Sequence, residues 1–241
     1  MAEAAPNTPQ LYAMGDRALV AEFGRSLNAG VNARVRAAAE HLLAHRLPGM
    51  TDVAPAFAAL TVHFDPLQVA AHYRTTDPVE AMRTALQHAL TKAPDLPKRK
   101  SRSIEIPVCY GGEFGEDLRL VAQHSGLSEE AVIEAHAAPD YHVYTLGFLP
   151  GFAYLGGLDR RLVTPRLESP RKRVPAGSVG IGGDQTGVYP FETPGGWNLI
   201  GRTPITLFQF DEQAHAVIEP GDRVRFVAIG ARDFQLLRDK R

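Results

Sequence analysis

Alternating apolar and polar residues mark strands in the first part of the chain. Residues 11–23 (LYAMGDRALVAEF) predict two short strands joined by a turn at Gly15 and Asp16. Residues 53–64 (VAPAFAALTVHF) predict either a strand pair or one long strand. These segments indicate a small antiparallel sheet near the N-terminus.

Apolar residues at helical spacing follow the first strands. Asn28 fits the N-cap of a helix that Pro48 and Gly49 end. Asp77 and Pro78 form a cap and first-turn pair that opens a second helix. One face of the first helix carries Val31, Val35, Ala38, Ala39, Leu42 and Leu43, and the second runs through Val79, Met82, Leu86 and Leu90.

The pattern changes in the second half. An alternating strand at 104–108 precedes two short helices, 116–124 and 128–137, and Ser128 caps the second of these. From Tyr141 onward, short apolar runs are punctuated by glycine and proline, which predicts many short strands in a sandwich or barrel. The expected fold class is therefore α+β.

A boundary separates the two halves. The segment 94–103 (PDLPKRKSRS) holds two prolines and four basic residues, which is typical of a solvated linker. A nuclear-localisation or nucleic-acid patch is the alternative, and the lack of basic charge elsewhere argues against it. We expect an N-terminal domain at 1–95, a linker at 96–103 and a C-terminal domain at 104–241.

Charge and cysteine content narrow the classes of protein. The net charge of −1 and pI near 6.8 argue against a nucleic-acid-binding protein, and no polybasic segment suggests a membrane surface. No apolar run approaches the ~18 residues of a membrane span. Cys109 is the one cysteine, so an intramolecular disulfide is impossible. With no signal-peptide pattern at the start, we expect a cytoplasmic protein.

Several catalytic motifs are absent or out of context. No dinucleotide fingerprint and no P-loop occur, although 180–187 is glycine-rich. Ser169 to Lys172 spells S-x-x-K, but the surrounding prolines argue against the helix that motif needs. Cys109 is expected to be a small buried residue rather than a nucleophile. The nine histidines show no ligand spacing, so we expect no metal site.

Arginines concentrate in one proline-rich stretch. Arg166, Arg171, Lys172 and Arg173 lie within eight residues, and Arg202 adds a further cation. Prolines restrict such a segment, and the guanidinium fork suits carboxylate or phosphate. We expect Arg166, Arg171 and Arg173 to bind an anion, with Arg202 in support. A solvated charged loop is the alternative, and we favour it for Lys172.

Three glycine-rich clusters flank these arginines, at 147–151, 180–183 and 194–196. Glycine lets backbone N–H groups approach a ligand closely, and pairs of such groups can bind an oxyanion. Tight turns in a barrel would use glycine equally well, so both interpretations stay open.

Polar and aromatic residues between the clusters could recognise an amide. Gln185 and Asn198 each offer a donor and an acceptor. Tyr189 and Trp197 could form one wall and donate hydrogen bonds. His142 is the candidate acid–base, because its pKa lies near neutrality, although a lone histidine is more often structural.

Four segments, which follow one another in a fixed order along the chain, carry a family resemblance. They are HVYTLGFLPGFAYLGGL, TPR…SPRKRVPAGSVGI, QTGVYPFETPGGW and LIGRTP, and the opening LYAMGDRALVAEFG agrees with them. Together they resemble the family of allophanate hydrolase subunit 1, KipI and the 5-oxoprolinase B subunit (PxpB), over essentially the whole chain. The resemblance implies a small α+β N-terminal domain and a cyclophilin-like β-barrel C-terminal domain. It also implies a KipA-like partner, of the type of the 5-oxoprolinase C subunit (PxpC) or allophanate hydrolase subunit 2.

The resemblance leaves three functions. The favoured one is the B subunit of an ATP-dependent 5-oxoprolinase, which works with PxpC-type and PxpA-type partners to open 5-oxoproline to glutamate. ATP would then be bound jointly with the partner. The alternatives are a KipI-type inhibitor of a sensor histidine kinase and a protein related to allophanate hydrolase or urea carboxylase. In the favoured function, Gln185 and Asn198 would orient the amide and the arginines would bind the carboxylate.

Overall fold

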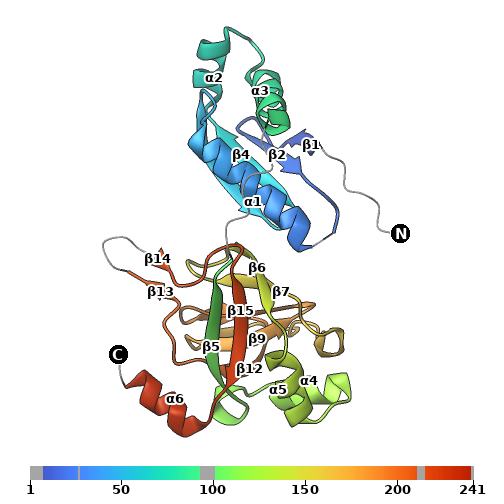
Figure 1. Cartoon of the computed structure of the whole chain (residues 1–241), viewed down its shortest axis with the longest axis vertical. Coiled ribbons are helices and arrows are strands. Elements are labelled where there is room, and N and C mark those ends of the chain that lie inside the picture. Colours follow the sequence, from blue (N-terminus) through green and yellow to red (C-terminus); the bar gives the residue numbers. More distant parts are fainter. Residues whose placement is uncertain (1–7, 27, 93–100, 211–214, 240–241) are drawn as a thin grey trace. The chain divides into compact units, whose positions relative to one another are not determined.

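A computed structural model describes residues 8–26, 28–92, 101–210 and 215–239 (Figure 1). The chain forms two compact units, Met1–Lys100 and Ser101–Arg241. Most of the expected linker, 96–100, lies outside the described residues. Its last expected residue, Ser103, already begins the first strand of the second unit.

The N-terminal unit is an antiparallel sheet with helices packed against it. Four strands pair in the order β1-β2-β4-β3, and α1 lies across the sheet (Figure 1). The strand pair expected at 11–23 is confirmed, and of the two alternatives for 53–64 the structure has the strand pair, with a turn at Phe57 between the strands. The elements are β1 Gln10–Ala13, β2 Ala18–Glu22, α1 Ala29–Ala44, β3 Met50–Ala56, β4 Ala59–Phe64, α2 Pro66–Tyr73 and α3 Pro78–Lys92.

Side-chain caps begin the helices of this unit. The Asn28 Oδ1 accepts from the Val31 backbone N–H at 2.8 Å, as the sequence predicts for an N-cap. Asp65 accepts from the Leu67 N–H at 2.8 Å and precedes a proline in the first turn of α2. This helix was not expected from the sequence. The buried core includes Leu19, Val35, Leu42, Leu60, Val62, Met82 and Leu86.

Removing the cap of α1 should weaken that helix. We expect Asn28→Ala to cost about 1 kcal/mol, because the Val31 N–H loses its acceptor at a helix start. Native-state hydrogen exchange in the first turn of α1 would report the change. Arg25→Ala, an exposed change just before the helix, is the control. Equal exchange rates in Asn28→Ala and the parent would contradict the prediction.

The C-terminal unit is a closed barrel of seven strands. Their order around the barrel is β10-β7-β6-β15-β5-β12-β9, and β9 pairs with β10 to close it. β15 runs parallel to β5, while the other neighbours are antiparallel. The barrel strands are β5 Ser103–Tyr110, β6 Tyr141–Leu146, β7 Ala153–Gly156, β9 Ser178–Gly182, β10 Gln185–Val188, β12 Asn198–Arg202 and β15 Arg223–Ala228.

Smaller elements surround the barrel. Two strand pairs, β8 with β11 and β13 with β14, lie outside it. The expected helix capped by Ser128 is confirmed as α5, and the expected α+β class with a barrel in the second half is confirmed. These elements are α4 Leu118–Ser125, α5 Glu129–Ala137, β8 Arg171–Val174, β11 Thr193–Gly195, β13 Phe208–Gln209, β14 His215–Ala216 and α6 Ala231–Arg238, with short helical turns at Gly112–Phe114 and Arg160–Leu162.

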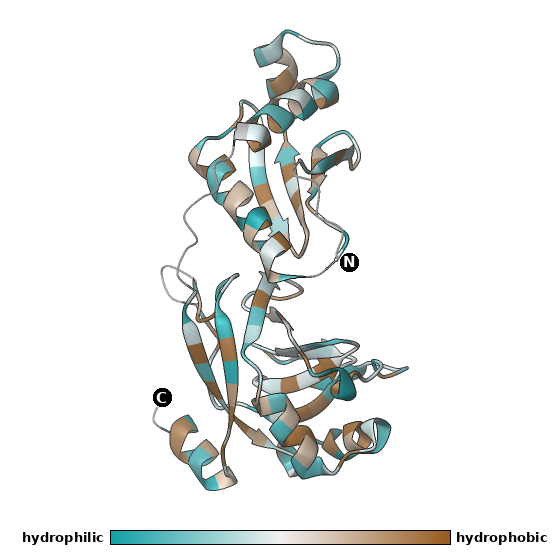
Figure 2. Cartoon of the chain, turned by 45° about the vertical axis from the view of Figure 1, so that its right-hand side comes forward, coloured by the Kyte–Doolittle hydropathy of each residue, from teal (hydrophilic) through white to brown (hydrophobic). Residues whose placement is uncertain are grey.

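Residues of β5 and β15 alternate between the barrel interior and the outside (Figure 2). Ile106, Val108 and Phe226 are among the inward side chains, all at most 1% exposed. Cys109 is also buried, as predicted, and burial raises the pKa of its thiol. Arg171 to Val174 form a strand, so the S-x-x-K residues do not share a helix.

A chain of hydrogen bonds crosses the barrel core. His136 is fully buried, with Nδ1 2.8 Å from the Tyr110 hydroxyl and Nε2 2.8 Å from Thr186 Oγ1. The Thr186 hydroxyl donates to the Gly180 carbonyl at 3.0 Å. Thr186 must therefore accept from Nε2–H, and Nδ1 accepts from Tyr110. Both ring nitrogens are satisfied in the neutral form, and burial lowers the pKa of His136 to about 3.

Candidate functional site

Trp197 belongs to a separate hydrophobic cluster of the C-terminal unit, outside the main barrel core. Its ring centroid lies 5.5 Å from that of Phe152 and 6.4 Å from that of Tyr189, both edge-on. All three side chains are at most 5% exposed. Tyr189 and Trp197 thus lie together, as expected for one wall, but as packed residues that present little surface.

Glycines of β9 and β10 provide the space for the Trp197 indole. A Cβ on Gly182 would lie 2.5 Å from the indole Nε1, and one on Gly187 would lie 3.1 Å from Cζ3. A Cβ on Gly180 would lie 3.2 Å from the tryptophan Cβ. Glycines of the 180–183 cluster therefore make room for the tryptophan ring. The two interpretations from the sequence, oxyanion binding and tight barrel turns, did not include this role.

Arg166 and Arg171 both reach Trp197. The Arg166 guanidinium carbon lies 5.8 Å from the indole centroid, in cation–π range, and the residue is exposed. In the described part of the chain, no carboxylate forms an ion pair with it. Arg171 Nη1 is 3.5 Å from the Trp197 carbonyl oxygen. Two of the predicted anion-binding residues thus meet at Trp197, Arg166 at its ring and Arg171 at its backbone carbonyl.

The charge of Arg171 is already balanced. Its Nη2 lies 2.6 Å from Asp117 Oδ1 and its Nε 2.9 Å from Glu116 Oε1. Asp117 is 7% exposed, and its Oδ2 accepts from the Leu199 N–H at 2.6 Å. Arg171 therefore ties β8 to the start of α4 and to β12. Asp117 was not expected from the sequence, because an acidic residue before a helix resembles an ordinary cap, yet here it makes no cap bond.

Removing the Asp117 carboxylate should destabilise this junction. We expect Asp117→Ala to lower the free energy of unfolding by about 1–3 kcal/mol, because the buried Leu199 N–H loses its acceptor and Arg171 keeps only the exposed Glu116. Urea unfolding would measure the change. Glu116→Ala is the matched control, with an expected loss below about 1 kcal/mol. Equal effects of the two variants would contradict this account.

The three predicted arginines do not converge as one set. The Arg173 side chain is 78% exposed and forms an ion pair with Glu192, with Nε and Nη2 each 3.0 Å from a carboxylate oxygen. It makes no described contact with Trp197. Of the three arginines expected to bind an anion, Arg166 and Arg171 lie together at Trp197 and Arg173 does not join them; Arg166 has no carboxylate partner among the described residues.

The two predicted amide-reading residues differ in placement. Asn198 is 1% exposed, and its Nδ2 donates to the Pro165 and Ile181 carbonyls at 2.8 and 3.1 Å. Its amide thus anchors the loop that precedes Arg166. Gln185 begins β10 and is half-buried, opposite Gly182 in the strand pair. Asn198 is in position to support Arg166 rather than to meet a ligand itself.

The remaining candidates, His142 and Arg202, make no described contact with Trp197. His142 is half-buried on β6, with its ring edge-on to Tyr144 at 4.9 Å. Arg202 Nε donates to the Ala176 carbonyl at 2.9 Å, and the side chain lines a different pocket. Neither residue belongs to the cluster around Trp197. Their expected roles remain predictions.

An apolar hollow adjoins the aromatic cluster. It has a volume of about 540 Å³ and is lined by 146–151, Phe208 and Ala216. Phe148 is 61% exposed at a positive φ of 68°, a strained conformation for a large side chain. Its ring lies 5.5 Å from Phe152, which packs on Trp197. The predicted glycine-rich cluster at 147–151 thus lines this hollow. The rings of Phe152 and Trp197 connect the hollow to the Arg166 guanidinium.

Two further observations concern metals and membranes. Over the described ranges, no three or more His, Cys, Asp or Glu side chains gather in a way that could hold a metal ion. None of the helices in those ranges has the length and apolar character to cross a bilayer.

The closed barrel, its flanking helices and the separate α+β unit before it together define a carboxyltransferase-type pair of subdomains. Residues 9–218 match the family described as carboxyltransferase domain, subdomain C and D, and the chain belongs to this family.

Curated and solved relatives agree with this family. The chain is 43% identical to the 5-oxoprolinase B subunit of Bacillus subtilis (strain 168) over 233 residues, 96% of this chain and 97% of that protein. It is 42% identical to the protein of the same name from Escherichia coli O157:H7, over 90% of this chain and 94% of that one. The crystal structure of TTHA0988 is 38% identical, with a TM-score of 0.74, and covers 89% of this chain. The match spans only 40% of the TTHA0988 chain.

Proposed function

We propose that this chain is the B subunit of a cytoplasmic ATP-dependent 5-oxoprolinase, which converts 5-oxo-L-proline, ATP and water to L-glutamate, ADP and phosphate. It would act with a KipA-like PxpC partner and a PxpA partner. The observation that carries the proposal is Arg166, an exposed guanidinium placed on the Trp197 ring with no described carboxylate partner. Two relatives that bear the name of the 5-oxoprolinase B subunit, similar over nearly their full lengths, support it.

In this proposal Arg166 binds the carboxylate of 5-oxoproline. Arginine suits a carboxylate because its planar fork can donate two parallel hydrogen bonds. The cation–π contact with Trp197 restricts the guanidinium before the substrate arrives, which lowers the entropic cost of binding. Arg171, already paired with Asp117 and Glu116, holds the Trp197 backbone in place.

The lactam is an unreactive amide that needs activation. Transfer of a phosphoryl group from ATP to the lactam oxygen, with release of ADP, would make the ring carbon susceptible to water. Hydrolysis of that intermediate releases phosphate and glutamate. This chain carries no P-loop, so we assign the placement of ATP to the contact with PxpC. The longer TTHA0988 chain, in which the equivalent of this chain is less than half, supports a partner that completes the site.

Reconstitution from purified proteins tests the proposal. We expect glutamate and ADP to form in equal amounts when this chain, PxpC, PxpA, ATP and 5-oxoproline are combined. Omission of this chain should abolish both products. Urea and allophanate serve as alternative substrates in parallel reactions. A sensor histidine kinase, followed by autophosphorylation, serves as the alternative target. Glutamate formation that persists without this chain would reject the proposal.

A further inference from the structure

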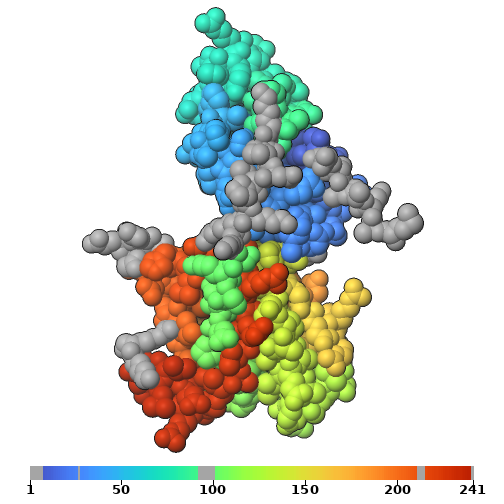
Figure 3. Space-filling view, in the orientation of Figure 1, coloured from blue at the N-terminus to red at the C-terminus, as the bar shows by residue number. Residues whose placement is uncertain are grey.

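A second pocket lies in the C-terminal unit, between α6 and the segment that follows β12. Its volume is about 170 Å³, and neither Arg166 nor Trp197 lines it. Figure 3 shows the surface that α6 contributes, in red. Arg202 and Arg238 line the pocket from different elements, and Pro190 and Pro204 contribute to its walls. Because proline backbones are restricted, these walls are largely preformed.

Arg202 is held in a fixed position at the pocket. Its Nε donates to the Ala176 carbonyl at 2.9 Å, so the side chain is anchored through one nitrogen. Gly177 allows the backbone of Thr203, the residue after Arg202, to lie close by, since a Cβ on Gly177 would lie 2.3 Å from the Thr203 carbonyl oxygen. Across 101–210 and 215–239, no carboxylate lies within ion-pair distance of Arg202. Its charge is therefore not balanced by the described residues.

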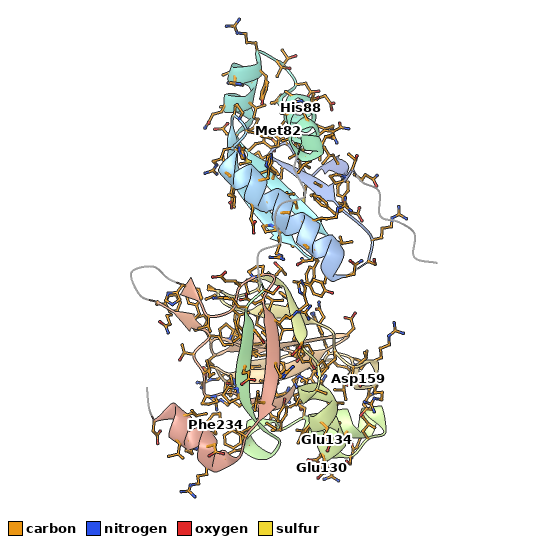
Figure 4. All side chains as sticks on the ribbon, viewed as in Figure 1. Met82, His88, Glu130, Glu134, Asp159 and Phe234 are labelled. Carbon is orange, nitrogen blue, oxygen red and sulfur yellow. The ribbon has the colours of Figure 1, made fainter. Side chains whose placement is uncertain are left out.

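Arg238 reaches the pocket from the last turn of α6. That helix is seated by Phe234, labelled in Figure 4, which is 4% exposed and lies 4.6 Å from the Phe114 ring centroid. Phe234 also lines the pocket. The Arg238 Nε is 3.5 Å from Asp239 Oδ1, and both side chains are more than half exposed. An exposed ion pair of this kind contributes little stabilising free energy. An anion in the pocket can therefore compete with Asp239 for the Arg238 guanidinium.

We propose that this pocket binds a phosphate group. Two guanidinium groups on separate elements favour an oxyanion with two negative charges and several acceptor oxygens over a single carboxylate. The volume is below the roughly 300–1,000 Å³ of sites for drug-sized ligands, which suits a phosphate rather than a whole nucleotide. The partial charge at the C-terminal end of α6 opposes an anion, but two full positive charges outweigh it. Neither Arg166 nor Trp197 lines this pocket, so phosphate binding here can be tested separately from the carboxylate site proposed at Arg166.

Calorimetric titration of the full chain, with no other protein present, tests the proposal. The probes are inorganic phosphate, ADP, ATP and glutamate, each at constant ionic strength set with chloride. We expect saturable binding of inorganic phosphate and none of glutamate. Arg202→Gln and Arg238→Gln should each raise the Kd about tenfold or more, because each removes a charge-assisted hydrogen bond. Arg225→Gln, which removes an arginine paired with Asp140 outside the pocket, is the matched control.

The nucleotide titrations separate two sources of the phosphate. ATP or ADP that binds more tightly than phosphate, and competes with it, identifies a terminal nucleotide phosphate as the ligand. Phosphate that binds at least as tightly identifies the free ion. Either result supports the pocket. Circular dichroism confirms folding of each variant, and Arg238→Gln, at an exposed helix end, keeps the test valid if Arg202→Gln does not fold. Absence of saturable phosphate binding, or parent-like binding by a folded variant at either position, would overturn the proposal.

Discussion

Arg166→Ala is expected to raise the KM for 5-oxoproline of the reconstituted complex by about 10- to 150-fold. A hydrogen bond to a charged group contributes about 1.5–3 kcal/mol, and a change of about 1.4 kcal/mol corresponds to a factor of ten. The interaction is made with a carboxylate that does not react, so binding of the ground state and transition state should weaken together. We therefore expect kcat to change much less than KM. Initial rates across a range of 5-oxoproline concentrations measure both.

Two further variants sharpen this experiment. Arg166→Lys keeps the charge but loses the planar fork that lies on Trp197, so its KM should fall between those of the parent and the alanine variant. Arg161→Ala removes an exposed arginine paired with Asp159 and serves as the control for general loss of positive charge. An unchanged KM in Arg166→Ala would show that the carboxylate is bound elsewhere.

Acid should destabilise the barrel through His136. In the folded chain its pKa is lowered to about 3, whereas an unfolded histidine titrates near 6.5. Between those values the unfolded state binds a proton that the folded state does not, so the free energy of unfolding falls as the pH falls. The slope is about 1.4 kcal/mol per pH unit, which gives a loss of roughly 2–3 kcal/mol from pH 6.5 to 4.5. Urea unfolding at several pH values, followed by near-ultraviolet circular dichroism, measures it.

A variant isolates this histidine from the carboxylates that also titrate in acid. His136→Gln retains a donor and an acceptor for Thr186 and Tyr110 but cannot take up a proton in this range. Its stability at pH 7 should be lower than that of the parent, and the gap should narrow as the pH falls. Two curves that run parallel from pH 7 to 4.5 would contradict the assignment.

Local signals in the sequence were sufficient to predict most helices and strands of the N-terminal unit. Asn28 and the Asp77–Pro78 pair marked helix starts, because capping chemistry depends on residues close in sequence. The same Asp–Pro signal stands at Asp65, before the short helix α2, so local sequence marks this helix start as well. The position of the turn within 53–64 could not be predicted, since a positive φ of 48° at Phe57 has no local signature.

The candidate site was predictable in composition but not in geometry. Arg171 and Arg173 are two residues apart, so a regular strand would place both on one face. The pairing of β8 with β11 shifts register between Gly195 opposite Arg171 and Thr193 opposite Val174. Such an irregularity changes the alternation of faces, so Arg171 reaches Asp117 while Arg173 meets solvent. Asp117 itself depends on a contact 54 residues distant in sequence, which no local pattern encodes.

The packing of Trp197 against the glycines of β9 and β10 has a practical consequence. Trp197 is the one tryptophan in the chain, so its fluorescence reports on a single place without any label. Its indole is shielded from water, packed on backbone and touched on one side by the Arg166 cation. A carboxylate that binds the guanidinium would change the charge beside the ring and so alter the emission. Substrate engagement could thus be followed optically in the unmodified protein, before any partner protein is added.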